Sequence, residues 1–167
     1  MLTIKQVESS ADAEAARERI REYTDWVLEM DPRGRQAPTF VNLEAELAGL
    51  PGEFVPPKAR LLLARIDGEP AGCICLRGHG AELCELKRLY VRPGFRGLQI
   101  GRQLVERLIE EAHAAGYGRI RLDSHHTMKT AHAVYEAAGF RYVEPPADFP
   151  DEFRDLAVFM ERELTQG

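Results

Sequence analysis

One stretch, Leu86 to Gly101, limits the folds open to this chain of 167 residues. In its first half Tyr90 and Val91 favour a strand, and Pro93 ends the extended run because proline cannot donate to a strand ladder. Gly94 and Gly97 then permit a sharp turn, after which a helical period begins. The first amides of a helix lack internal partners and carry positive partial charge, so such a turn favours a bound phosphate. The stretch therefore predicts a strand, an anion-binding turn and a helix.

Other phosphate-binding motifs fit this stretch poorly. No Gly-Lys-Ser/Thr triplet follows the turn, which argues against the loop of nucleoside triphosphatases. The glycines are not spaced as Gly-x-Gly-x-x-Gly, so a dinucleotide-binding fold is not supported. Arg96 and Arg102 flank the turn and add formal positive charge. On local chemistry alone, the turn is either an anion site or an ordinary tight turn.

The strand before the turn, about Glu82 to Val91, has a break in its apolar pattern. Cys84 and Leu86 are apolar at even positions, whereas Leu89 and Val91 are apolar at odd positions. One inserted residue shifts the phase of a strand in this way, so the pattern predicts a β-bulge. Two short strands joined by a kink are the alternative.

The remaining pattern predicts a mixed sheet with helices on both faces. Strands are expected over 2–7, 60–66, 71–76, 82–91, 119–123, 141–144 and 156–160, and helices over 10–30, 42–50 and 98–115. A last helix begins near Ser124 or Thr127 and ends at Gly139. Ser10 or Asp12 is the expected N-cap of the first helix. The length suits a single domain over residues 1–167.

Composition narrows the classes of protein. The chain is 44% hydrophobic and 29% charged, as in an ordinary soluble globule, and its net charge of −5 argues against nucleic acid as a partner. Its apolar runs are too short to cross a bilayer, and the first residues do not resemble a signal peptide. Three cysteines cannot all pair, so we expect the reducing environment of the cytoplasm.

Two motifs resemble those of the GNAT superfamily of N-acetyltransferases. Residues 89–93 followed by 96–101 resemble the superfamily's acetyl-CoA pyrophosphate motif, Arg/Gln-x-x-Gly-x-Gly/Ala, and residues 131–140 resemble Ala-x-x-Leu-Tyr-x-x-x-Gly-Phe. The resemblance implies an α/β fold with a mostly antiparallel sheet of about seven strands, a bulged fourth strand and helices on both faces. Gln99 stands where the first motif usually has glycine, and Met128 stands where many members have asparagine.

The resemblance also implies how the cosubstrate acetyl-CoA binds. The backbone of residues 89–91 would pair with the pantetheine arm like an added strand, and residues 96–102 would hold the pyrophosphate. An amide freed by the bulge would stabilise the oxyanion. The implied cofactor-binding residues are Leu89, Tyr90, Val91, Arg96, Gly97, Leu98, Gln99, Ile100, Gly101 and Arg102.

Two residues are the candidates for proton transfer. Tyr135 matches the superfamily's tyrosine that protonates the departing thiolate of coenzyme A, although a lone helical tyrosine is usually structural. Glu85 lies just before the expected bulge, where many members place a glutamate, and would deprotonate the acceptor ammonium directly or through water. The structural alternative for Glu85 is a solvated carboxylate paired with Lys87 or Arg88.

The acceptor is less constrained by the sequence. His125, His126 and His132 form a cluster near a strand end, but they lack acidic or cysteine partners at ligand spacing, so we expect no metal. They line the acceptor pocket or simply make a polar strand end. Acidic residues of the last loop favour a cationic acceptor, whereas Arg33 and Arg35 favour an acidic one.

The sequence thus predicts an acetyl-CoA-dependent N-acetyltransferase acting on a primary amine of a small molecule or peptide, by direct transfer in a ternary complex. A non-catalytic acyl-CoA sensor on the same fold is the alternative, and a phosphate-binding domain unrelated to acyl transfer is a third. Whether the acyl group is larger than acetyl, and whether the chain forms a homodimer, stay open at this stage.

Overall fold

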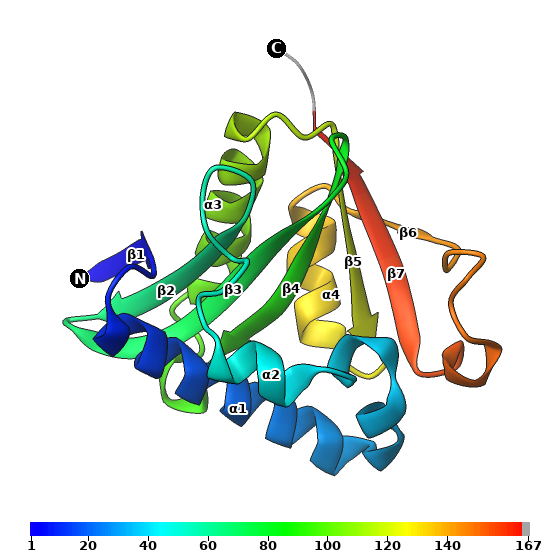
Figure 1. The fold of residues 1–167 in the computed structure, drawn as a ribbon, viewed down its shortest axis with the longest axis horizontal. Coiled ribbons are helices and arrows are strands. Elements are labelled where there is room, and N and C mark those ends of the chain that lie inside the picture. The colour runs from blue at the N-terminus through cyan, green and yellow to red at the C-terminus, as the bar shows by residue number, and fades with distance from the viewer. Residues whose placement is uncertain (165–167) are drawn as a thin grey trace.

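A computed structural model describes residues 1–164 as one seven-stranded sheet. Its strands run in the order β1-β2-β3-β4-β5-β7-β6, and the only parallel pair among the described strands is β4 with β5 (Figure 1). The strands are β1 (Leu2–Gln6), β2 (Arg60–Ile66), β3 (Glu69–His79), β4 (Leu83–Val91), β5 (Arg119–His125), β6 (Arg141–Val143) and β7 (Ala157–Glu163). The predicted mixed, mostly antiparallel sheet of seven strands is confirmed.

Helices cover both faces of this sheet, as predicted (Figure 1). One face carries α1 (Ser10–Met30) and α2 (Leu43–Ala48), and the other carries α3 (Ile100–Ala114) and α4 (Lys129–Ala137). Short 3₁₀ turns lie in the connections, namely η1 (Pro32–Gln36), η2 (Pro38–Phe40), η3 (Pro93–Phe95) and η4 (Asp151–Phe153). None of the helices within residues 1–164 is long and apolar enough to cross a membrane.

The predicted helix caps are wrong in two places. Ser9 is the N-cap of α1, and its hydroxyl accepts a hydrogen bond from the backbone amide of Asp12. Asp12 therefore lies in the first turn of the helix and donates to the N-cap residue. Met128 is the N-cap of α4 and makes no side-chain capping bond. Ser124 belongs to β5, because the strand continues two residues beyond the predicted end.

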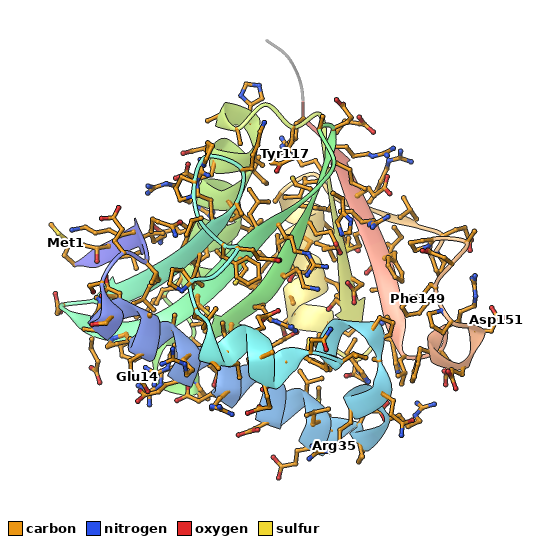
Figure 2. The ribbon with its side chains drawn as sticks, in the orientation of Figure 1. Met1, Glu14, Arg35, Tyr117, Phe149 and Asp151 are labelled. Atoms are coloured by element: carbon orange, nitrogen blue, oxygen red, sulfur yellow. The ribbon has the colours of Figure 1, made fainter. Side chains whose placement is uncertain are left out.

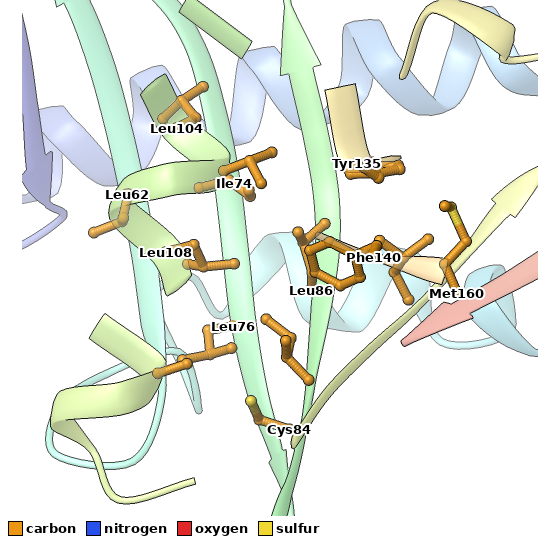
Figure 3. Packing of buried hydrophobic residues seen from close by; sticks show 14 of the residues in the cluster. Leu62, Ile74, Leu76, Cys84, Leu86, Leu104, Leu108, Tyr135, Phe140 and Met160 are labelled. Atoms are coloured by element: carbon orange, nitrogen blue, oxygen red, sulfur yellow. The ribbon is translucent and has the colours of Figure 1, made fainter. Parts of the chain in front are cut away.

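The core has two layers, one on each face of the sheet. The layer under α3 and α4 includes Leu86, Leu104 and Leu108, and reaches Tyr135 and Phe140 of the α4 region (Figure 3). The layer under α1 and α2 contains the alternate side chains of the same strands. Cys73 and Cys75 belong to that second layer, and both are buried and unpaired. The cysteines are therefore small core residues, as predicted.

The predicted bulge lies in β4. Cys75 pairs with Lys87 and Cys73 with Tyr90, so two residues of β4 stand opposite one residue of β3. Arg88 takes the extra position with a φ of 60°, in the left-handed region. Leu86 therefore packs under α3 and α4 before the bulge, and Tyr90 packs on the opposite layer after it.

β4 and β5 diverge from each other just before the bulge. They pair over three positions only, from Leu83 with Arg119 to Glu85 with Arg121. Beyond this point the strands separate toward their C-terminal ends, and α4 lies behind the opening (Figure 1). The edge of β4 after Glu85 therefore has no neighbouring strand on the β5 side, so its backbone groups face this opening.

The close approach of β3 to the bulge generates a stability prediction. A Cβ atom added at Gly72 would lie 2.4 Å from the carbonyl oxygen of Tyr90 and 3.3 Å from the Cα of Val91. Since both atoms belong to backbone, Gly72→Ala should lower the free energy of unfolding by about 1–3 kcal/mol in denaturant titration.

Gly94→Ala is the matched control. A Cβ atom there meets no described atom within 4 Å, and the residue is not in the left-handed region. We expect its unfolding free energy to stay within about 0.5 kcal/mol of the parent. Equal stabilities of the Gly72 and Gly94 variants would contradict the close packing at the bulge.

Candidate active site

Two cavities meet where β4 and β5 diverge. The larger has a volume of about 730 Å³ and lies beside the turn before α3 and the start of α4. The smaller has a volume of about 70 Å³ and lies under the segments that follow α1 and β6. Their shared lining residues are Tyr23, Leu86, Arg88, Asp123 and Ser124. The arrangement therefore provides two compartments with a common junction.

Nearly all of the residues predicted to bind the cofactor line the larger cavity. They are Leu89, Tyr90, Val91, Arg96, Gly97, Gln99, Ile100, Gly101 and Arg102. Leu98 is 54% exposed and is not part of that lining within the described residues. The predicted strand and turn thus lie along one continuous wall.

The turn brings the start of α3 to this wall. Gly97 has a φ of +90°, which L side chains rarely adopt, and the N-cap Gln99 has a φ of 60°. A non-glycine residue in this left-handed conformation costs roughly 1–2 kcal/mol. Arg96 fastens the turn, since its Nε donates to the Val91 carbonyl at 3.1 Å and its guanidinium lies 5.5 Å from the Trp26 ring. The amides at the beginning of α3 are suited to an anion.

Tyr135 lies on α4 in the wall of the larger cavity. Its side chain is buried, and its ring packs at 5.8 Å from that of Phe140 (Figure 3). Burial raises the pKa of its hydroxyl well above the ordinary value, and the neighbouring Tyr23 and Asp123 raise it further. The hydroxyl consequently stays protonated at neutral pH, and it can act as a donor toward the cavity.

Arg88 anchors the bulge between the two cavities. Its side chain is 3% exposed and its Nε lies 3.2 Å from Oε2 of Glu46, on α2. Its guanidinium also lies 5.2 Å from the ring of Phe40. A buried arginine needs such a carboxylate, because an uncompensated charge at this depth is strongly destabilising. The bulge is therefore tied to α2 and to η2.

Asp123 is a functional candidate that the sequence analysis missed. It lies on β5, it is mostly buried, and it lines both cavities. Burial raises its pKa, and Glu85 raises it further, whereas Lys87 and Arg88 oppose the shift. A carboxylate with a raised pKa at the junction is suited to accept a proton. In the sequence, the feature that could have identified Asp123 is a carboxylate that directly follows the apolar Leu122 within a short predicted strand.

Glu85, the predicted base, is held away from the junction. It pairs in register with Arg121 at the last paired position of β4 and β5. Its carboxylate contacts the ring of His79 and lies 3.9 Å from Nη2 of Arg77. As far as residues 1–164 are described, Glu85 lines neither cavity.

The three histidines lie in different environments. His125 lines the smaller cavity, and its ring stacks at 4.7 Å on that of His126. His132 is buried behind β5, where its Nε2 lies 3.1 Å from the Ser124 hydroxyl, and burial lowers its pKa. The described residues contain no group of three or more histidine, cysteine or acidic side chains that could hold a metal ion.

Two segments close over the smaller cavity and are joined by ion pairs. Arg33 in η1 donates from Nη1 to Asp155 at 3.0 Å, and it also pairs with Asp31 at 3.1 Å. Asp31 in turn lies 3.2 Å from Nε2 of His125. Figure 2 labels Arg35 on the first segment and Phe149 on the second. Arg33 is thus engaged by carboxylates of the protein itself, while Arg35 is exposed.

Comparisons with known proteins bear on the family and the fold of this chain. The family model described as the acetyltransferase (GNAT) family matches residues 15–140. An N-acetyltransferase of Schizosaccharomyces pombe is 38% identical over 109 residues, which cover 64% of this chain and 67% of that protein.

Solved structures share the fold at low identity. An acetyltransferase from Streptococcus agalactiae superposes with a TM-score of 0.76 at 22% identity, and the match covers 98% of both chains. The PaiA N-acetyltransferase from Thermoplasma acidophilum, solved with coenzyme A, has a TM-score of 0.74 at 21% identity over 98% of this chain and 99% of that one.

The ion pairs at Asp31 generate a pH prediction. Hydrogen bonds from Arg33 and then His125 lower the pKa of Asp31 from 3.8 to about 2. A lowered folded-state pKa adds stability that is present above the unfolded value and is lost as the pH falls toward the folded value. Asp31→Asn should therefore be less stable than the parent near neutral pH, and the difference should shrink between pH 4 and pH 2.

The measurement is denaturant unfolding of the parent and variant across this pH range. Glu29→Gln is the control, because Glu29 is exposed near the same end of α1 and its loss makes the same change in net charge. A stability difference at Asp31 that is independent of pH would show that these ion pairs do not hold the segment.

Proposed function

The chain belongs to the GNAT family of acetyltransferases, as its two motifs predicted, and from this premise we propose that it moves an acetyl group from acetyl-CoA to a primary amine. The acceptor is a small molecule or a peptide, and transfer is direct, within a ternary complex. The observation that carries this proposal is the junction of two cavities, because direct transfer needs separate compartments for donor and acceptor that meet at the reacting atoms.

The larger cavity is the proposed site of acetyl-CoA. Its volume of about 730 Å³ lies in the range of small-molecule sites. The amides from Gly97 to Gly101, with Arg96 and Arg102 beside them, would hold the pyrophosphate. The edge of residues 89–91, which has no strand neighbour on the β5 side, would pair with the pantetheine arm. Acetyl-CoA supplies the activated thioester, and the residues of the chain orient it and neutralise the charge of its pyrophosphate.

The protein groups at the junction divide the chemistry between them. An amide of the bulge at Arg88 stabilises the oxyanion that forms when the amine attacks the thioester. Tyr135 donates its hydroxyl proton to the departing thiolate, and the second proton that the attacking nitrogen loses as the amide forms restores the hydroxyl. A carboxylate accepts the proton from the acceptor ammonium before the attack, since only the neutral amine has a free electron pair.

Two carboxylates compete for the role of base. Asp123 lines both cavities, which supports direct proton transfer from an amine at the junction. Glu85 requires an intervening water, as its carboxylate is engaged by His79 and Arg77. We therefore assign the proton acceptor to Asp123 and give Glu85 an electrostatic role, because its charge raises the pKa of Asp123.

The cellular location and the partners that we propose are based on the composition of the chain and on the burial of its cysteines. Residues 1–167 are proposed to form one N-acetyltransferase domain that acts in the cytoplasm, without nucleic acid or membrane as a partner. Its net charge of −5 and its three buried, unpaired cysteines support this assignment.

Tyr135→Phe tests the acid and separates the enzyme from a non-catalytic acyl-CoA sensor. Loss of a positioned acid typically costs a factor of 10² to 10⁴, so kcat should fall by about that much. The affinity for acetyl-CoA should be unchanged, because the ring and its packing remain. Steady-state thiol release and calorimetric binding measure the two quantities.

Tyr142→Phe is the matched control for this variant. Tyr142 is 49% exposed on β6, and it lines neither cavity within the described residues. Its kcat should equal that of the parent. Unchanged turnover in Tyr135→Phe would remove Tyr135 from the mechanism, whereas acetyl-CoA binding by the parent without thiol release would favour the sensor.

Asp123→Asn and Glu85→Gln identify the base. A raised pKa at Asp123 means that kcat/KM of the parent should fall on the acid side as this carboxylate is protonated. Asp123→Asn should lower kcat/KM by about 10² to 10⁴ and abolish that acid limb. Glu85→Gln should keep the limb but move it to lower pH, because a negative charge near Asp123 has been removed.

The pH profile of kcat/KM for each variant is the measurement, with acetyl-CoA affinity as the check on folding. If Glu85→Gln loses the acid limb and Asp123→Asn retains it, the assignment is reversed and Glu85 is the base.

A further inference from the structure

The smaller cavity is walled by aromatic rings from separate parts of the chain. Tyr23 comes from α1 and Phe40 from η2, while Phe149 and Phe153 come from the connection between β6 and β7. Val27 and Leu156 complete the apolar part of the wall. Rings of this kind contribute apolar contact area, and their faces also attract a cation. The wall therefore favours an apolar body attached to an ammonium group.

The volume of this cavity limits the size of its occupant. A water molecule needs about 10–15 Å³ of such cavity volume, so about 70 Å³ holds roughly five to seven waters. At about 30 Å³ for each water in the liquid, the occupant has a volume of roughly 150–210 Å³. That is the size of a short arylalkylamine or a branched alkylamine.

The segments over the cavity are packed together. Ala37, Phe153 and Leu156 form a buried cluster that joins the residues after α1 to those before β7. The ion pair between Arg33 and Asp155 bridges the same two segments at their surface. A polypeptide chain would have to separate this cover to place its amine at Asp123, whereas a small molecule fits beneath it.

The cationic side chains in the wall of the smaller cavity interact with carboxylates of the protein. Arg88 pairs with Glu46, at 3.2 Å between Nε and Oε2. Burial and Arg88 lower the pKa of Lys87, and Asp123 and Glu85 oppose that shift. Arg88 thus has a carboxylate of the protein as its ion-pair partner, and the charges of Asp123 and Glu85 act on Lys87. An acceptor that carries its own carboxylate would have to compete with these groups for the cations, at a cost in desolvation.

We infer that the acceptor is a compact, apolar primary amine without a carboxylate, and that its body occupies the ring-walled cavity while its nitrogen lies at Asp123. This inference rests on the proposed function and narrows it to one class of substrate. Amino acids, and the amines of peptides, are excluded as preferred acceptors.

The experiment compares acceptors that differ in one respect. Thiol release from acetyl-CoA is measured with phenethylamine and L-phenylalanine, which differ by a carboxylate, and with an octapeptide that has a free N-terminal phenylalanine. We expect kcat/KM for phenethylamine to exceed both others at least tenfold. A value for phenylalanine or the peptide that equals or exceeds that for phenethylamine overturns the inference but leaves N-acetyl transfer intact. Absence of thiol release with every amine, while acetyl-CoA still binds, overturns both.

A pair of variants tests the cavity itself. Phe153 and Phe159 are 7% and 6% exposed, but only Phe153 lines the cavity within the described residues. Phe153→Leu removes ring volume from the wall, so the ratio of kcat/KM for 3-phenylpropylamine to that for benzylamine should rise at least fivefold. Phe159→Leu should leave the ratio unchanged. The same ratio in both variants would show that the acceptor does not lie between these rings.

Discussion

The bulge at Arg88 is the constraint on which the rest of the site depends. It places two residues of β4 opposite one residue of β3, and it puts a non-glycine residue into the left-handed region at a cost of roughly 1–2 kcal/mol. The ion pair with Glu46 and the contact with Phe40 hold that conformation in place. Without the bulge, β4 would continue its pairing and its phase, and no backbone edge would be left for a ligand.

The divergence of β4 from β5 then explains why two cavities share one junction. The larger cavity extends from this opening to the start of α3 and to Tyr135 on α4, and the smaller extends toward the cover formed after α1 and β6. Asp123 stands on the opposite side of the opening from the bulge and reaches both. Donor, acceptor and proton-transfer groups can therefore meet at one place, although they come from distant parts of the sequence.

The sequence predicted the features that local chemistry determines. The phase change between Leu86 and Leu89 predicted the bulge, and the glycines with Pro93 predicted the turn, because both effects act within a few residues. The position of Tyr23 and Asp123 at the junction of the cavities could not be predicted, since it depends on how α1, β4 and β5 come together. For the same reason the partner of Glu85, His79 on β3, was missed. The α1 cap was predicted at Ser10 or Asp12 instead of Ser9, because all three residues are good caps and only backbone geometry distinguishes them.

The most direct test of the central claim, that the opening between β4 and β5 binds acetyl-CoA, is thermal unfolding with and without this ligand. At 100 times its dissociation constant, a ligand adds about 2.7 kcal/mol of stability. For a chain of this size that corresponds to a rise of roughly 5–10 °C in Tm. We predict such a rise, larger than that given by ADP, and its loss in Gly97→Val, where the positive φ excludes a branched side chain. An unchanged Tm at millimolar acetyl-CoA would contradict this claim, because it would show that the opening does not bind the acetyl donor.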